Sequence, residues 1–226
     1  MSDIDLRTKA LLQDDYNKLL NKKVAVIGLG GVGSIVPLTL VRTGIKNLII
    51  VDKDKVESSN LNRQIAYDGN DIGEYKSIAL KNKLKKIRSD IEILDISKSI
   101  DETFDFSVFK GCDFIVDCID DINAKIQLAK FALANNIKFI SSLGMGNRID
   151  PSKVFITKLN KTTGCPLAKK FRYMLKKENV DISNINVAFS NEEPIIKNKV
   201  VSSIAFVPNA AGLNISSFVV KTLIGW

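Results

Sequence analysis

Histidine is absent from this sequence. None of the 226 residues is a histidine, which excludes Ser-His-Asp triads and histidine-ligated metal centres. Cysteine is scarce, since only Cys112, Cys118 and Cys165 are present and no C-x-x-C pair occurs. An odd number of isolated cysteines argues against a disulfide framework or a structural zinc, and indicates a reducing compartment.

Long apolar runs are missing as well. No uninterrupted apolar stretch has the length needed to cross a bilayer. The first residues, Met1-Ser2-Asp3-Ile4-Asp5, lack the basic and apolar parts of a signal peptide. We therefore expect a cytoplasmic protein with no membrane partner.

The remaining composition is that of a globular chain with an excess of positive charge. Apolar residues make up 45% of the sequence, enough to bury one sizeable core, so a single domain is expected. Lysine and arginine number 33 against 25 acidic residues, for a formal net charge of +8. This excess indicates an anionic partner such as a nucleotide or a nucleic acid.

A glycine-rich turn follows the first predicted strand. The apolar run 24–27 is typical of a buried strand, and Gly28, Gly30 and Gly33, with Gly31 among them, follow in G-x-G-x-x-G spacing. Bare backbone amides at the start of a helix bind phosphate through unpaired N–H groups and the helix dipole. The turn alone is a weak signal, because dehydrogenases share it and an ordinary tight turn is the alternative.

Predicted strands and helices alternate along the first 150 residues. An amphipathic helix within 5–20 is followed by strands at 24–27, 47–51, 91–96, 113–117 and 138–143, and by helices at 34–43, 73–88 and 123–135. This alternation predicts a Rossmann-like, doubly wound α/β fold with a mainly parallel sheet. We expect one domain, with a nucleotide-binding core at 1–150 and a C-terminal extension at 151–226. The extension is expected to add antiparallel strands at 154–159 and 200–207 and a closing helix at 210–223.

Polar residues follow several of the predicted strands. Ligands of such sheets bind beyond the carboxyl ends of the strands, so Asp52, Asp117, Asp120 and Gly144 are candidates for one site. Asp52 follows Gly33 at the spacing of an acid that binds ribose hydroxyls. Arginine and lysine side chains can hold phosphate oxygens, and carboxylates suit hydrated magnesium.

Taken together, these motifs resemble the adenylating domain of the ubiquitin-activating-like superfamily. The resemblance rests on the glycine turn, the acid at 52, Ser-Asn-Leu-Asn-Arg-Gln at 59–64, the lysine at 76 and Asp-Cys-Ile-Asp at 117–120. It implies ATP and Mg²⁺ as cofactors and a homodimer. The implied nucleotide-binding residues are Gly28, Gly30, Gly31, Gly33, Asp52, Asn60 and Gln64. The implied catalytic residues are Arg63, Lys76, the magnesium ligand Asp120, and Arg7, which matches an arginine supplied by the partner subunit.

Motifs of the last third resemble the tRNA threonylcarbamoyladenosine dehydratase family within that superfamily. They lie at 144–151, 166–169, 190–194 and 206–212. The resemblance implies a substrate-facing extension and ATP-dependent adenylation of the threonine carboxylate of N6-threonylcarbamoyladenosine in tRNA. Ring closure then releases AMP. Many members carry a longer cysteine-rich insertion where this chain has only 195–204, so the need for a sulfur-transfer or other accessory protein stays open.

A basic segment at 158–177 contains no acidic residue. With tRNA implied, we expect its cations to contact the RNA backbone, and the alternative is a solvated helix face. The candidates are Lys169, Lys170, Arg172, Lys176 and Lys177. A second basic group, Lys81, Lys83, Lys85, Lys86 and Arg88, is expected to be solvent-exposed. Phe171 and Tyr173 either stack on a base or pack in the core.

Two other functions remain open from sequence. One is an adenylating activator of a small ubiquitin-like sulfur carrier, against which the missing C-x-x-C pairs count. The other is a non-catalytic nucleotide-binding module, against which the retained charged residues of a triphosphate site count.

Overall fold

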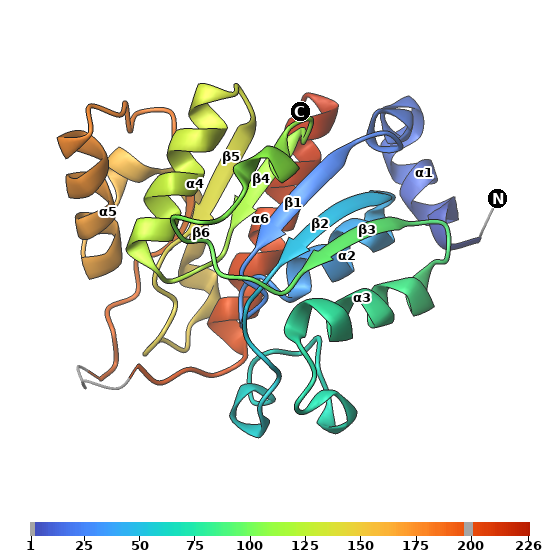
Figure 1. Ribbon diagram of the computed structural model, residues 1–226, viewed down its shortest axis with the longest axis horizontal. Coiled ribbons are helices and arrows are strands. Elements are labelled where there is room, and N and C mark those ends of the chain that lie inside the picture. Colours follow the sequence, from blue (N-terminus) through green and yellow to red (C-terminus); the bar gives the residue numbers. More distant parts are fainter. Residues whose placement is uncertain (1–2, 197–200) are drawn as a thin grey trace.

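A seven-stranded sheet forms the centre of the computed structural model, which describes residues 3–196 and 201–226 (Figure 1). Its order is β3-β2-β1-β4-β5-β7-β6. The strands are β1 (Lys23–Ile27), β2 (Asn47–Val51), β3 (Glu92–Ile96), β4 (Phe114–Asp117), β5 (Lys138–Ser142), β6 (Val154–Lys158) and β7 (Asn186–Ser190). All pairings are parallel except that of β6 with β7. The prediction of a Rossmann-like α/β fold with a mainly parallel sheet is confirmed.

Helices cover both faces of the sheet. α2 (Ile35–Thr43), α3 (Lys76–Ile87) and α6 (Phe206–Ile224) contribute to one apolar core. α4 (Ile122–Ala134) and α5 (Pro166–Lys177) contribute to the other. Strand residues alternate between the two cores, as the period of two requires. In β1, for example, Val24 and Val26 belong to the first core, and Ala25 and Ile27 to the second.

The sheet reverses its winding between β1 and β4. The chain leaves β1 for α2 on one face, and leaves β4 for α4 on the other. In register, Ile27 pairs with Val51 on β2 and with Asp117 on β4. The residues that follow these three strands therefore lie side by side at a topological switch point, where open α/β sheets bind their ligands.

The N-terminal segment differs from the single helix expected within 5–20. α1 (Leu6–Leu12) ends at Gln13, whose φ of 51° breaks the helix, and a 3-10 helix continues to Leu19. Arg88 was expected to be solvent-exposed, but it is buried. Its Nη1 and Nη2 donate to the two carboxylate oxygens of Asp5 at 3.0 and 2.9 Å. This pair ties the N-terminal segment to the end of α3.

The predicted strand at 200–207 is wrong. Residue 200 lies outside the described residues, 201–204 form no regular structure, and α6 already begins at Phe206. The antiparallel partner of β6 is instead β7, a short strand not anticipated from the sequence. The closing helix is confirmed, with an earlier start than residue 210.

No helix among the described residues combines the length and the hydropathy required to span a membrane.

Candidate active site

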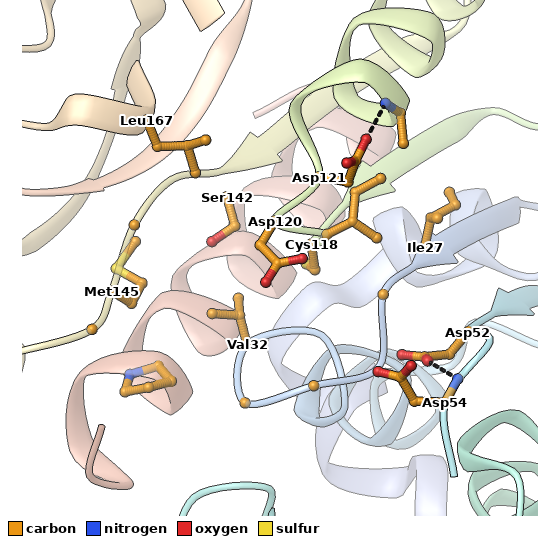
Figure 2. A pocket seen from close by; sticks show the side chains of 18 of the residues that line it. Ile27, Val32, Asp52, Asp54, Cys118, Asp120, Asp121, Ser142, Met145 and Leu167 are labelled. Carbon is orange, nitrogen blue, oxygen red and sulfur yellow. Dashed lines mark hydrogen bonds between the residues drawn. The ribbon is translucent and has the colours of Figure 1, made fainter. Parts of the chain in front are cut away.

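A cleft of about 1580 Å³ opens at the carboxyl ends of the strands. The glycine turn, the loops after β2 and β4, the β5–β6 loop and the segment before α6 all line it. In Figure 2, Asp52 and Asp54 lie on one side of this cleft, and Met145 and Leu167 lie on the other. The cleft is larger than the 300–1,000 Å³ typical of a single small-molecule site, so it has room for two reactants.

The glycine turn is shaped by backbone contacts. Gly28 has a φ of +84°, and a side chain at Gly33 would overlap the carbonyl oxygen of Gly28. The amide groups of Gly30, Gly31 and Val32 donate no hydrogen bond to any described residue, and all three residues line the cleft. Free amides beside a helix start form a site for phosphate oxygens.

Asp52 supports this turn from the end of β2. Its Oδ2 accepts from the Leu29 amide at 2.6 Å, and its Oδ1 accepts from the Asp54 amide at 2.8 Å. Burial raises the pKa of the Asp52 carboxyl above its ordinary value, although the two amides act in the opposite direction. The carboxylate lines the cleft, where it can accept hydrogen bonds from ribose hydroxyls.

Two cationic side chains and two side-chain amides lie beside the glycine turn. Lys76 is buried at the start of α3, with its Nζ 3.2 Å from Asp54 Oδ2. The Arg63 side chain runs past Gly31, and its Nη1 donates to the Ser59 carbonyl at 2.9 Å. Asn60 and Gln64 are buried on the same loop and line the cleft. The Gln64 Oε1 has no hydrogen-bond partner among the described residues.

The loop after β4 places one free carboxylate in the cleft. Figure 2 shows the Asp120 carboxylate directed toward the glycine turn, whereas Asp121 Oδ1 accepts from the Ala124 amide at 2.8 Å and caps α4. Asp120 has no hydrogen bond or ion pair within the part of the chain that the structure describes. One carboxylate together with substrate phosphates is a common magnesium environment. No cluster of three acidic or thiol ligands occurs among the described residues, so phosphates would have to supply the other ligands.

Asp117 was expected at one site with Asp52 and Asp120, but it does not line the cleft. It is fully buried, and its Oδ2 accepts from Lys125 Nζ at 2.9 Å and from Ser141 Oγ at 2.7 Å. Lys125 Nζ also donates to the Ser142 carbonyl at 2.7 Å. Sequence reasoning missed Lys125, because a lysine inside a helix is usually solvated. The network joins the ends of β4 and β5 to α4.

Arg7 does not line the cleft of its own chain. It is exposed on α1, which Figure 1 shows near the start of β1, away from the loop that follows that strand. Any contribution of Arg7 to a site would therefore have to be made to another subunit.

The basic segment forms α5, with Ala168, Phe171 and Leu175 buried. This answers the question about Phe171, which packs in the core, while Tyr173 is exposed. The four lysines proposed for tRNA contact, Lys169, Lys170, Lys176 and Lys177, are exposed. Arg172 is half-buried and donates to the Thr162 carbonyl at 2.9 Å.

The β5–β6 loop contributes residues that the sequence did not single out for this site. Asn147, with a φ of 60°, exchanges hydrogen bonds of 2.7 Å with the Ser202 backbone, and Asn62 Nδ2 donates to the Ser203 carbonyl at 2.9 Å. These contacts hold 201–203 along the cleft. Arg148 is buried in the same wall and lines the cleft. Cys165 is buried at the start of α5 and also lines the cleft.

The chain is similar to several known proteins. It matches the ThiF family over residues 4–226. A Bacillus subtilis relative, tRNA threonylcarbamoyladenosine dehydratase, is 33% identical over 95% of this chain and 92% of its own length. The tRNA threonylcarbamoyladenosine dehydratase 2 of Saccharomyces cerevisiae is 40% identical over 80% of this chain, which spans only 41% of that longer protein.

Solved structures show the same fold. The Escherichia coli tRNA N6-threonylcarbamoyladenosine dehydratase in complex with AMP superposes with a TM-score of 0.93 at 24% identity, covering 99% of this chain and 96% of that one. The same protein in complex with ATP gives a TM-score of 0.92 at 24% identity, with the same coverage. With a family match over nearly its whole length, the chain belongs to the ThiF family.

Proposed function

We propose that the chain is an ATP-dependent tRNA threonylcarbamoyladenosine dehydratase. It would adenylate the threonine carboxylate of N6-threonylcarbamoyladenosine in tRNA and close the modified group into a ring. The printed names of the B. subtilis and yeast relatives support this substrate, and the AMP and ATP complexes of the E. coli protein support the nucleotide.

One observation carries the proposal. Free turn amides, a buried acid at the end of β2, two cations and an unpaired carboxylate converge in one cleft. A scaffold that only binds a partner has no need for this set of charges. Adenylation mainly requires two anions to be aligned and the charge at phosphorus to be neutralised, which is what the set can do.

Each group has a distinct role in the first step. The Asp52 carboxylate would hold ribose, and the free amides of Gly30 and Gly31 would hold phosphate. Gly28 and Gly33 would shape this turn, since the Gly28 amide itself donates to the Val51 carbonyl at 2.8 Å. Asn60 and Gln64 would orient the triphosphate. Arg63 and Lys76 would neutralise the charge that develops as a substrate carboxylate oxygen attacks the α-phosphorus and pyrophosphate leaves. The products of this step are an acyl-adenylate and pyrophosphate.

Asp120 is the residue that would hold Mg²⁺. When bound there, Mg²⁺ would offset the negative charge of the phosphates. The unpaired Asp120 carboxylate, directed into the cleft, fits a metal that draws its other ligands from phosphates and water.

The second step needs no nucleophile from the protein. AMP is a good leaving group, so a nucleophilic atom of the same modified nucleoside can attack the activated carbonyl and close the ring. The net change is the loss of one water from the nucleoside, balanced by conversion of ATP to AMP and pyrophosphate. The absence of histidine is compatible with this chemistry.

The larger assembly is also part of the proposal. The chain would act as one adenylating domain in a cytoplasmic homodimer, with Arg7 entering the partner's cleft. The exposed lysines of α5, with Arg172 beside them, would contact the RNA backbone, which makes binding sensitive to salt. An accessory sulfur-transfer protein stays a prediction.

The deciding experiment is nucleoside mass analysis of threonylcarbamoylated tRNA incubated with the protein. We expect the modified nucleoside to lose one water only when ATP and Mg²⁺ are both present. No loss, from folded protein that binds ATP, would contradict the assignment and redirect the search to protein C-termini as substrates.

Two variants separate an enzyme from a binding module. Arg63→Ala should reduce turnover by at least about 100-fold with little change in the thermal unfolding midpoint, since an electrostatic contact of this kind contributes roughly 2.7–4 kcal/mol to catalysis. Asp120→Asn should raise the Mg²⁺ concentration required for half-maximal turnover. Unchanged turnover in both variants would favour the module.

A further inference from the structure

Arg148 differs from the other buried cations of the chain. Four lysine or arginine side chains are buried among the described residues. Three of them, Lys76, Arg88 and Lys125, each contact at least one carboxylate. Arg148 is only 7% exposed and forms no ion pair with any described residue. A buried charge without an opposite charge is unfavourable, so a missing anionic partner is expected.

The contacts of Arg148 hold its guanidinium without neutralising it. Nε donates to the Glu192 carbonyl at 2.8 Å, and Nη1 donates to the carbonyls of Gly144 and Gly146 at 2.9 and 3.1 Å. The Glu192 carboxylate is used elsewhere, because it accepts from the backbone amides of Ile149 and Asp150. Nη2 donates to no described residue, so the N–H groups of this one nitrogen remain available on a fixed, planar cation.

The place of Arg148 in the cleft suggests which anion it meets. Arg63, the other cleft arginine without an ion pair in the described chain, lies beside Gly31 of the glycine turn and is thereby assigned to the triphosphate. Arg148 lies on the β5–β6 loop, next to the start of α5, since a side chain at Gly144 would contact Cys165 Sγ at 3.7 Å. The positive end of the α5 dipole adds to the charge of this wall.

We propose that Arg148 binds the carboxylate of the second substrate and presents it for adenylation. This inference rests on the proposed function and names the residue that recognises the group being activated. The Nη2 group of this fixed cation can donate charge-assisted hydrogen bonds to a carboxylate. A carboxylate at the end of a small modification can enter the cleft and reach Arg148. A phosphate of the RNA backbone is flanked by nucleotides on both sides, so it cannot approach a side chain that is only 7% exposed.

The test compares an acid with its ester. The probes are an RNA anticodon stem-loop bearing N6-threonylcarbamoyladenosine and the same RNA with the threonine carboxylate as its methyl ester. Binding is measured with the full chain in the presence of an ATP analogue whose α,β-bridge cannot be cleaved. The wild type should prefer the acid. In Arg148→Gln, acid binding should weaken by about tenfold or more, the loss typical of a charged hydrogen bond, while ester binding and analogue binding stay unchanged.

Two further variants distinguish recognition from a structural role. Arg148→Lys keeps the charge without the planar guanidinium and should restore part of the preference for the acid. Asn147→Gly retains the left-handed backbone but removes the side-chain contact to Ser202, and should leave the acid-to-ester ratio as in the wild type. An unchanged ratio in Arg148→Gln overturns the inference, even if both RNAs bind more weakly. A wild type that dehydrates no modified tRNA overturns the proposed function itself.

Discussion

At the residue scale, burial decides which charges take part in chemistry. Asp52 is an example. Burial raises the pKa of its carboxyl, while hydrogen bonds from two backbone amides favour the ionised carboxylate. The ionised carboxylate is the form that accepts two ribose hydroxyls. Protonation removes that capacity, so binding should weaken as the pH falls through the raised pKa.

This pH dependence can be measured with adenosine, which has no phosphate that titrates. We expect adenosine affinity to fall at low pH, with a midpoint above the ordinary aspartate pKa. Asp52→Asn should bind more weakly at neutral pH and lose this dependence. Calorimetric titration from neutral to acidic pH provides both curves, and an Asn variant with the wild-type profile would assign the titration to another group.

The burial of several charged side chains was not predicted from the sequence. Asp52, Asn60, Arg63, Gln64, Lys76 and Asp120 were anticipated, and the structure brings all of them to one cleft. Arg88, Lys125 and Arg148 were not anticipated as buried, because the contacts that bury them form only in the fold, as between Arg88 and Asp5 at a separation of 83 residues. A single sequence without the fold gives no sign of such pairs.

At the scale of elements, the glycine turn offers two positions with different constraints. A side chain at Gly33 would overlap the Gly28 carbonyl and approach Cys118 Cβ at 2.8 Å, whereas one at Gly30 would meet only Gln64 Nε2, at 3.9 Å. Gly33 is therefore required by the fold. Gly30 is free of such conflict in the protein alone and is exposed to whatever docks on the turn.

The matched substitutions should separate these roles. Gly33→Ala should lower the free energy of unfolding by about 1–3 kcal/mol through overpacking. Gly30→Ala should change it by less than about 1 kcal/mol, yet weaken ATP binding by at least about tenfold because a methyl group separates the backbone from the phosphates. Denaturant unfolding and ATP titration give the two values. Gly69→Ala, where nothing lies within 4 Å, is the control, and normal ATP binding by Gly30→Ala would contradict phosphate contact at this turn.

Element boundaries were predictable wherever the hydrophobic period was sustained. Apart from the N-terminal segment, the strands and helices of the first 150 residues appear close to their expected positions. The failure at 200–207 has a physical cause. Val201 and Ile204 favour a strand in sequence, but both side chains are exposed, and the backbone of Ser202 and Ser203 bonds to Asn147 and Asn62 and not to a strand. β7 (Asn186–Ser190) was not predicted, and its length does not set it apart, because β1 and β2 also have five residues.

At the scale of the whole molecule, the position of Arg7 bears on assembly. It lies on α1, outside the cleft of its own chain. In a two-fold symmetric dimer each subunit contributes the same surface to the other, so one arginine can complete each of the two sites. The homodimer is part of our proposal, and it makes the two active sites depend on both chains.

Mixing two inactive variants tests this dependence. Arg7→Ala and Arg63→Ala should each lack activity. In a mixed dimer, the Arg7→Ala chain retains its own Arg63 and receives an intact Arg7 from its partner. Equal mixing with full exchange should therefore restore about a quarter of wild-type turnover, since half of the dimers have one complete site. Co-purification of differently tagged chains verifies exchange. Exchange without recovery would place Arg7 outside the partner's site.

The buried pair of Lys125 and Asp117 has a consequence for how this sequence can change over time. Removing either partner leaves the other as an isolated charge in the core, at a cost of about 3–5 kcal/mol, whereas an apolar pair of similar volume is often tolerated. The route between these two states passes through a destabilised intermediate. A substitution at either position should therefore be tolerated only together with a compensating change at the other.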